Sequence, residues 1–260
     1  MHKARLHLCK DGTHTLYSER YDQFFHNPNG AVGEARHVFF EIPGLYRRIE
    51  QSNGFRLLEI GFGTGLNLLL LMEFLNKIDA GNPRKEGSVK VTYTSVEANP
   101  LTTEQAVKLN YPGKIDLSNG SEILACIFNR IQPGVNQMSL NRTVDLKLIY
   151  SRFDQISRPD EPYDAILFDP FSPEVNSELW TREVFQKLAE WSDPDVLLST
   201  YCAASKARGA MAAAGWHIAS AQGALGKREM TIASLNPKNL TAWKPVNRDR
   251  LAKRYFEGDF

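Results

Sequence analysis

The sequence lacks the hallmarks of several protein classes. Its three cysteines, Cys9, Cys126 and Cys202, are too few and too scattered for a disulfide framework, and neither they nor the six histidines show metal-ligand spacing. No apolar run approaches the length needed to cross a membrane, and no apolar core follows the basic start of the chain as in a secretory signal. We therefore expect a cytoplasmic protein with no metal and no membrane partner.

The chain also lacks an excess of positive charge. Its 31 Lys and Arg residues nearly balance 30 Asp and Glu residues, for a net charge of +1. Sequence-independent binding of nucleic acid usually requires a clear basic excess, so the overall composition does not indicate it. Residues 238–254 are a local exception, with six basic residues, one acid and an interleaved Trp243. Both a solvated helix and a binding face fit this segment.

What the chain does have is the composition of a globular α/β protein. A length of 260 residues, 42% of them hydrophobic and 23% charged, suits one large domain with appendages. We expect an N-terminal extension over 1–50, a main domain over 51–237 and a basic tail over 238–260. Within the extension, alternation over 5–17 around Asp11-Gly12 predicts a β-hairpin with a tight primed turn.

Residues 57–67, LLEIGFGTGLN, are the most informative stretch. They predict a buried strand, a glycine turn and a leucine-rich helix, in which Gly61, Gly63 and Gly65 let a ligand lie against the backbone at a helix N-terminus. The spacing is not that of the dinucleotide motif, and Glu59 precedes the first glycine by two positions. The pattern resembles the first motif of class I S-adenosylmethionine-dependent methyltransferases. A glycine turn that binds nothing is the alternative.

The rest of the chain predicts a Rossmann-like fold. Further strands are expected over 89–96, 144–150, 163–168, 196–201, 216–221 and 229–235, and helices over 102–110, 121–130, 180–191 and 203–214. Residues 79–88 and 133–142 are expected to be loops. With helices between the first five strands and a terminal pair, the sheet is seven-stranded and mostly parallel, as in class I methyltransferases.

Two acids stand at predicted strand ends, where doubly wound sheets bind ligands. Glu97 is suited to accept hydrogen bonds from ribose hydroxyls, although a helix-capping acid is the alternative. Asp169 opens a stiff Asp-Pro-Phe-Ser-Pro loop beside the glycine strand. Its alternative role is to cap the following helix or to satisfy backbone N–H groups.

Together the motifs resemble the methyltransferase domain of the tRNA wobble-uridine modifying enzyme MnmC, which makes 5-methylaminomethyl-2-thiouridine. The resemblance covers about residues 17–235. It rests on residues 18–22 (SERYD), 27–30 (NPNG), 34–39 (EARHVF), 61–67 (GFGTGLN), 97–102 (EANPLT), 169–173 (DPFSP) with Asn176 and Trp180, and 226–230 (GKREM).

The resemblance implies methyl transfer from S-adenosylmethionine to the primary amine of 5-aminomethyl-(2-thio)uridine in the anticodon stem-loop of tRNA. The sequence has no second glycine-rich nucleotide motif for an oxidase half, so we expect a stand-alone methyltransferase, and no obligatory protein partner is visible in it. Asp169 would hold and deprotonate the amine and Phe171 would shape the site. The cofactor-binding residues would be Glu34, Arg36, Glu59, Gly61, Phe62, Gly63, Thr64, Gly65, Asn67, Glu97, Phe153, Asp154 and Asp169.

Several assignments keep an alternative. Glu34 and Arg36 are equally suited to a surface ion pair, and Lys227 and Arg228 either contact tRNA phosphates or lie in a solvated loop. Arg152 stands where the family has its adenine-binding acid, so Asp154 or the backbone at Phe153 would take that part.

Pro170 replaces a small residue and makes the loop similar to the Asp-Pro-Pro-Tyr loops of amino-methyltransferases. For the whole protein, the competing functions are a class I amine methyltransferase for a small molecule or a protein, and a non-catalytic tRNA-binding relative.

Overall fold

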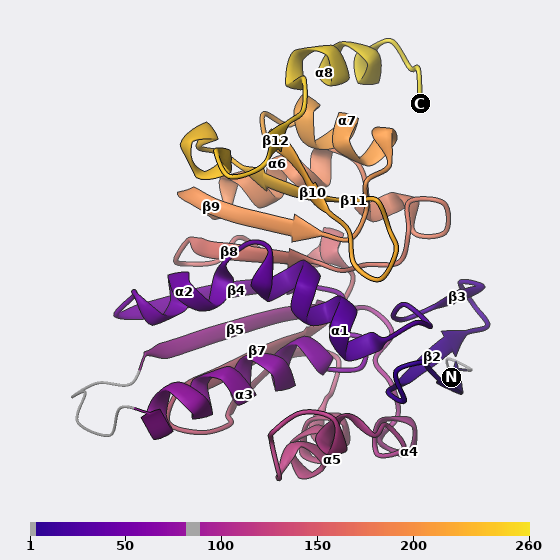
Figure 1. The fold of residues 1–260 in the computed structure, drawn as a ribbon, viewed down its shortest axis with the longest axis vertical. Helices are drawn as coiled ribbons and strands as arrows, with labels where there is room; N and C mark the ends of the chain where they lie inside the picture. The colour runs from indigo at the N-terminus through magenta and orange to yellow at the C-terminus, as the bar shows by residue number, and fades with distance from the viewer. Residues whose placement is uncertain (1–3, 82–88) are drawn as a thin grey trace.

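A central β-sheet organises the molecule (Figure 1). The computed structural model describes residues 4–81 and 89–260. Five parallel strands form the middle of the sheet: β4 (Gly54–Ile60), β5 (Lys90–Glu97), β7 (Val144–Tyr150), β8 (Tyr163–Phe168) and β9 (Ser192–Thr200). The antiparallel strands are β6 (Gly134–Ser139), β10 (His217–Gln222), β11 (Glu229–Ser234) and β12 (Lys244–Pro245). Among the described residues the order is β12-β10-β11-β9-β8-β4-β5-β7-β6.

Helices cover both faces of this sheet. One face carries α1 (Ala31–Ala35), the π-helical turn η1 (Arg36–Glu41), α2 (Leu45–Glu50), α3 (Leu66–Gly81) and α5 (Gly120–Arg130). The other carries α6 (Arg182–Glu190), α7 (Ser205–Ala213) and α8 (Arg248–Phe256). Short helical segments are α4 (Thr103–Ala106), η2 (Tyr111–Gly113), η3 (Phe153–Gln155), η4 (Ser177–Leu179) and η5 (Pro237–Leu240).

Successive side chains along each strand point to opposite faces of the sheet, so the strands contribute to two hydrophobic cores, one on each face. In β4, Leu57 belongs to the first hydrophobic cluster, with α3, whereas Leu58 and Ile60 belong to the second, with α6 and α7. A strand buried on both faces needs an apolar run, which is why β4 and β8 have little alternation of polarity. Complete burial of one leucine side chain stabilises the fold by roughly 1.5–3 kcal/mol, so this run fixes β4 firmly at the centre.

The N-terminal extension adds a separate small sheet of β1 (Ala4–Leu8), β2 (His14–Ser18) and β3 (Gln23–Phe24). The predicted hairpin is confirmed, but the predicted primed turn is wrong. The Gly12 N–H bonds to the Cys9 carbonyl at 3.0 Å, the Cys9 N–H bonds to the Thr13 carbonyl at 2.7 Å, and within this turn only Gly12 has a positive φ, of 80°. This is a three-residue loop with the glycine in the left-handed region, because a primed turn would need positive φ at two successive residues.

The predicted fold class is confirmed, with two additions at the sheet edges. Residues 133–142 are not a loop, since they contain β6, whose backbone pairs with β7; β12 adds a strand at the opposite edge. The expected helix between the third and fourth strands is also wrong, because that connection contains only the short turn η3. The predicted loop over 79–88 is wrong for residues 79–81, which belong to α3; residues 82–88 lie outside the described residues.

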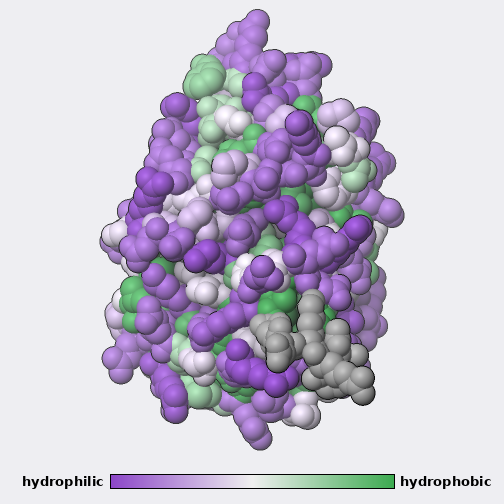
Figure 2. Space-filling view, turned by 90° about the vertical axis from the view of Figure 1, so that its left-hand side faces the viewer, coloured by the Kyte–Doolittle hydropathy of each residue, from purple (hydrophilic) through white to green (hydrophobic). Residues whose placement is uncertain are grey.

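The proposed division at residues 50 and 237 stays a prediction. α1 and α2 share a core with α3, β12 joins the main sheet, and Leu251 and Tyr255 of α8 pack on the second core. No helix in the described part of the chain is long and apolar enough to span a membrane. Figure 2 shows the face at the amino ends of the parallel strands, where hydrophilic residues predominate and hydrophobic ones are scattered.

Candidate functional site

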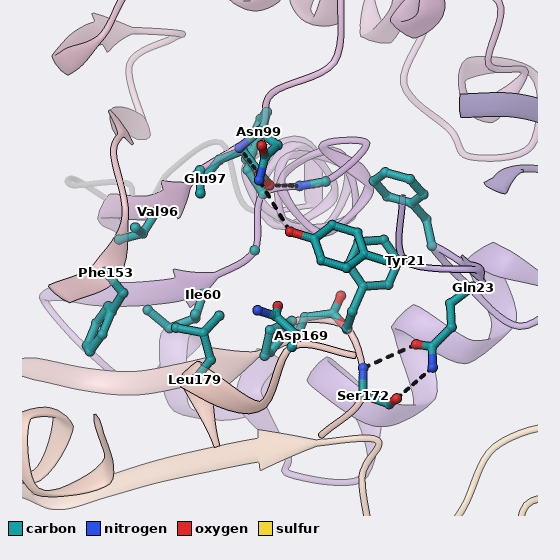
Figure 3. A pocket seen from close by; sticks show the side chains of 18 of the residues that line it. Tyr21, Gln23, Ile60, Val96, Glu97, Asn99, Phe153, Asp169, Ser172 and Leu179 are labelled. Atoms are coloured by element: carbon teal, nitrogen blue, oxygen red, sulfur yellow. Dashed lines mark hydrogen bonds between the residues drawn. The ribbon is translucent and has the colours of Figure 1, made fainter. Parts of the chain in front are cut away.

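A cleft of about 800 Å³ opens at the carboxyl ends of β4, β5 and β8. The N-terminal segment around β3 forms another of its walls, together with the loop after β7 and the start of α6. Parallel strands bring their carboxyl ends to one edge of the sheet, so segments that are distant in sequence meet there. We define the apolar end of the cleft by Ile60, Val96, Phe153 and Leu179, which Figure 3 shows on one side of it. We define the acidic end by Glu34, Asn67 and Asp169.

The glycine turn lies between the two ends. Gly61, Gly63 and Gly65 have φ of 92°, 52° and 78°, in the left-handed region that favours glycine. A Cβ on Gly61 would lie 2.8 Å from the Asp169 carbonyl oxygen, and one on Gly65 would lie 2.7 Å from Leu124 Cδ2. The turn therefore packs directly against the end of β8, and no side chain separates it from the loop that begins at Asp169.

Glu97, at the end of β5, is held by the backbone. Its carboxylate accepts hydrogen bonds from the N–H groups of Gly63 at 3.0 Å and Asn99 at 2.7 Å. Removal from bulk water raises the pKa of Glu97, and the backbone N–H groups act in the opposite direction. The glycine turn thus fixes this carboxylate at the middle of the cleft.

Asn67 connects two carboxyl groups. Its Nδ2 donates to Glu59 Oε1 at 2.9 Å and to Asp169 Oδ2 at 3.3 Å, while Ser95 Oγ donates to the other Glu59 oxygen at 2.7 Å. Burial raises the pKa of Glu59 to about 8. The pKa of Asp169 also lies well above its usual range, first because of desolvation and then because of the charges of Glu59 and Glu34.

One polar atom at the acidic end remains unpaired. Asn67 Oδ1 is buried and has no hydrogen-bond partner within residues 4–81 and 89–260. A buried acceptor without a donor is costly, and a donor from a bound ligand would remove that cost. Glu34, at the same end, accepts from the Asn27 N–H at 2.7 Å and pairs with Lys227 Nζ at 2.8 Å.

The loop after β7 forms the wall of the apolar end. Lys187 of α6 donates to the carbonyl oxygens of Phe153 at 3.3 Å and Ile156 at 3.0 Å, and its Nζ lies 5.2 Å from the Phe153 ring centroid. At the rim, Arg152 forms an exposed two-pronged ion pair with Asp154. Figure 3 shows the Phe153 ring at the opposite side of the cleft from Tyr21.

Aromatic and amide side chains from the N-terminal extension bridge the mouth of the cleft. The Tyr21 ring stacks on Phe171 with centroids 4.4 Å apart, and Asn99 Nδ2 donates to the Tyr21 hydroxyl at 3.4 Å. Gln23 exchanges two hydrogen bonds with Ser172, of 2.6 and 3.2 Å (Figure 3). The extension is therefore part of the site and joins the ends of β5 and β8.

Comparisons with known proteins agree with this geometry. Residues 120–236 match a family model described as S-adenosyl-L-methionine-dependent methyltransferase. The structure of MNMC2 from Aquifex aeolicus superposes with a TM-score of 0.72 at 21% sequence identity, covering 98% of this chain and 76% of that one. The chain therefore has the fold of that structure, and its second half matches the methyltransferase family model.

Curated relatives are similar over most of this chain. The tRNA 5-methylaminomethyl-2-thiouridine biosynthesis bifunctional protein MnmC of Cupriavidus necator is 30% identical over 88% of the chain, and that of Cupriavidus metallidurans is 32% identical over 91%. The alignments cover 33% and 34% of those proteins. The chain thus spans about a third of the length of the curated relatives it matches.

The residues of the cleft fit S-adenosylmethionine by their chemistry. The cofactor has an apolar adenine ring, a ribose with two hydroxyls and a zwitterionic methionine end. The cleft offers an apolar end, a central carboxylate in Glu97 and, at the acidic end, an acceptor without a donor in Asn67 Oδ1. The described residues contain no cluster of three or more His, Cys, Asp or Glu side chains that could hold a metal ion.

The structure brings most of the predicted site residues to the cleft, but not all. Those that line it are Glu34, Gly61, Phe62, Gly63, Thr64, Asn67, Glu97, Phe153, Asp154, Asp169, Phe171 and Lys227. Arg36 instead bonds to Glu73 of α3 at 2.5 Å, outside the cleft lining. Glu59 and Gly65 lie behind the lining, the former 1% exposed, and the side chain of Arg228 is exposed to solvent.

Sequence reasoning gave no role to several residues of the cleft. Tyr21 and Asn99 line the cleft and belong to sequence motifs on which the family resemblance rests. Their presence in those motifs could have identified them as site residues. Gln23 and His26 had no such signal. His26 contacts Thr64 of the glycine turn at 3.4 Å, and desolvation lowers its pKa to about 4, so it stays neutral.

Proposed function

We propose that this protein transfers a methyl group from S-adenosylmethionine to the primary amine of 5-aminomethyl-(2-thio)uridine at the wobble position of tRNA. The observation that carries the proposal is Asp169, a partly buried carboxyl that lines the cleft beside the glycine turn and has a raised pKa. The curated relatives are named for the biosynthesis of 5-methylaminomethyl-2-thiouridine in tRNA, and this supports the proposed substrate.

The proposed cofactor site runs the length of the cleft. The apolar end receives the adenine, and Glu97 accepts hydrogen bonds from the ribose hydroxyls. The methionine moiety lies along Gly61, Gly63 and Thr64 toward the acidic end, where the two glycines have no side chain to keep the ligand away from the backbone. When bound, the cofactor supplies a methyl group attached to a positively charged sulfur.

Asp169 is the proposed proton acceptor. An aliphatic amine enters as an ammonium ion and must lose a proton before its nitrogen can bond to carbon. A carboxylate with a raised pKa is a stronger base than an ordinary aspartate, and the ammonium charge favours its ionised form while both are bound. Phe171, two residues later, forms the adjacent wall and excludes water from the reacting nitrogen.

The proposed tRNA contacts lie around the mouth of the cleft. Arg228 is exposed on the loop between β10 and β11, next to Lys227 in the cleft lining, and is free to approach a phosphate. We propose that the anticodon stem-loop docks there and presents a single wobble nucleoside, which is the usual way proteins read RNA loops. Such a substrate also agrees with a cytoplasmic protein.

The decisive experiment measures methyl transfer to tRNA. Labelled S-adenosylmethionine is incubated with tRNA that carries 5-aminomethyl-2-thiouridine, and the nucleosides are separated after digestion. Label in 5-methylaminomethyl-2-thiouridine is expected with the wild type and is strongly reduced with Asp169→Asn. If the protein binds the cofactor but labels only a free amine or a protein, the alternative amine methyltransferase is correct. If it binds tRNA and labels nothing, a non-catalytic role is correct.

A further inference from the structure

One basic side chain, that of Lys227, lies at the acidic end of the cleft. Four Lys or Arg residues line the cleft in the described part of the chain, and three of them lie near Glu97 and the apolar end. Arg20 donates to Asn99 Oδ1 at 2.6 Å, Arg152 pairs with Asp154, and Lys187 donates to two carbonyl oxygens. Lys227 is the fourth, and it pairs with Glu34.

The side chain of Lys227 is held in place by two groups. Its Nζ donates to Glu34 Oε1 at 2.8 Å and lies 4.8 Å from the centroid of the Tyr201 ring. The Tyr201 hydroxyl in turn donates to the carbonyl oxygen of Pro170 at 2.8 Å, next to Asp169. An ammonium group has three N–H donors, so this arrangement fixes Lys227 and still leaves donor capacity toward the cleft.

The loop that carries Lys227 is tightly built. A Cβ on Gly223 would lie 2.6 Å from the Lys227 carbonyl oxygen, and the Lys227 N–H bonds to the Ala224 carbonyl at 2.9 Å. Leu225 has a φ of 47°, which is uncommon for a residue with a side chain, and its Cδ1 lies 3.3 Å from where a Cβ on Gly30 would be. Strained backbone of this kind persists where the surrounding contacts demand it, often at ligand sites.

We infer that Lys227 binds the carboxylate of the methionine moiety of S-adenosylmethionine, and that Asn67 Oδ1 accepts a hydrogen bond from its ammonium group. This inference rests on the cofactor site proposed above. A zwitterionic group needs one cation and one acceptor close together, and the acidic end supplies both. Glu34 is a positioning residue, because its two oxygens are already occupied by Lys227 and the Asn27 N–H.

Two ligands that differ only in the carboxylate test the inference. The affinities of S-adenosylmethionine and decarboxylated S-adenosylmethionine are measured by calorimetry for the wild type, Lys227→Met and Arg228→Met. The wild type is expected to prefer the carboxylated ligand by about 10- to 100-fold, the usual effect of a charge-assisted hydrogen bond. Lys227→Met should lose this preference and keep its affinity for the decarboxylated ligand within about threefold. The neighbouring Arg228→Met should behave as the wild type does.

Lys227→Met leaves the buried Glu34 without its cation, so the double variant Lys227→Met/Glu34→Gln is measured beside it. If both variants bind the two ligands with equally reduced affinity, Lys227 only supports the fold. If both variants still prefer the carboxylated ligand as the wild type does, the carboxylate binds elsewhere. Either result overturns the inference and leaves the proposed function standing. If the wild type binds neither ligand, the proposed function fails, and the inference fails with it.

Discussion

Replacing Gly61 with alanine tests how closely the glycine turn is packed against the end of β8. The new Cβ would lie 2.8 Å from the Asp169 carbonyl oxygen and 3.2 Å from its carbon. Both are backbone atoms and cannot rotate away as a side chain would. Gly61→Ala therefore adds a steric conflict to the ordinary strain of a side chain at a φ of 92°.

Gly215 provides a matched control, since its φ is 94° and no heavy atom lies within 4 Å of the position of a Cβ. A side chain at such a φ lowers the free energy of unfolding by roughly 1–2 kcal/mol. Replacing glycine with alanine also reduces the entropy of the unfolded chain, which offsets about 0.4–1 kcal/mol of that loss. Gly215→Ala should thus lower the free energy of unfolding by about 1 kcal/mol. Gly61→Ala should lower it by roughly 1–3 kcal/mol more, the usual cost of overpacking.

Urea denaturation of the two variants measures both free energies. Calorimetry with S-adenosylhomocysteine provides a second readout, because relief of the conflict moves Asp169 away from the turn. We expect Gly61→Ala to lose most of its affinity and Gly215→Ala to retain it. If Gly61→Ala proves as stable as Gly215→Ala, the close packing of turn and strand inferred from the structure is wrong.

Three further predictions concern the carboxyl groups. Asp169→Asn should lower kcat by roughly 100- to 10,000-fold, the usual contribution of a general base, while S-adenosylhomocysteine still binds; a nearly active variant in the methyl-transfer assay would remove Asp169 from the mechanism. Glu97→Gln should weaken the binding of S-adenosylhomocysteine by about 10- to 100-fold in calorimetry, because an amide can accept only one of the two backbone N–H bonds, and unchanged affinity would exclude its ribose role. Burial raises the pKa of Glu59 from 4.5 to about 8 in the folded protein. The protonated carboxyl therefore stabilises the fold fully below pH 4.5, and this contribution to the free energy of unfolding is lost as the pH rises through about 8. Between about pH 5 and about pH 9 in urea denaturation, the wild type should therefore lose a few kcal/mol more stability than Glu59→Gln, and parallel pH profiles would show that Glu59 titrates normally.

The centre of the fold could be predicted because its signals are local. About ten consecutive residues are enough to predict β4 and its glycine turn, because an apolar run is followed directly by the glycines. The same holds for β8, a short apolar strand that ends just before Asp169. A strand buried on both faces leaves this mark in its own composition.

The sheet edges could not be predicted in the same way. β6 is polar and largely exposed, so its sequence shows no alternation between a core face and a solvent face. It is a strand because its backbone groups pair with β7, and backbone pairing leaves little trace in side-chain pattern.

Within the site, sequence reasoning found residues but not their pairings. Arg36 was expected at the cofactor, yet its guanidinium pairs with Glu73 on α3, outside the cleft lining. Lys227 was expected at tRNA phosphates, whereas the structure pairs it with Glu34 in the cleft. Which acid a cation meets depends on how helices and loops pack across the fold, and that information is not local in the chain.

The contact between Glu34 and Lys227 also bears on how the protein folds. These residues are 193 positions apart, so their ion pair forms only after β10 and β11 have joined the sheet. Closing so large a loop carries an entropy cost that earlier contacts must first offset, and contacts of this range tend to slow folding. During synthesis from the N-terminus, the cleft is therefore completed late, because Lys227 is the last residue of the chain to join its lining.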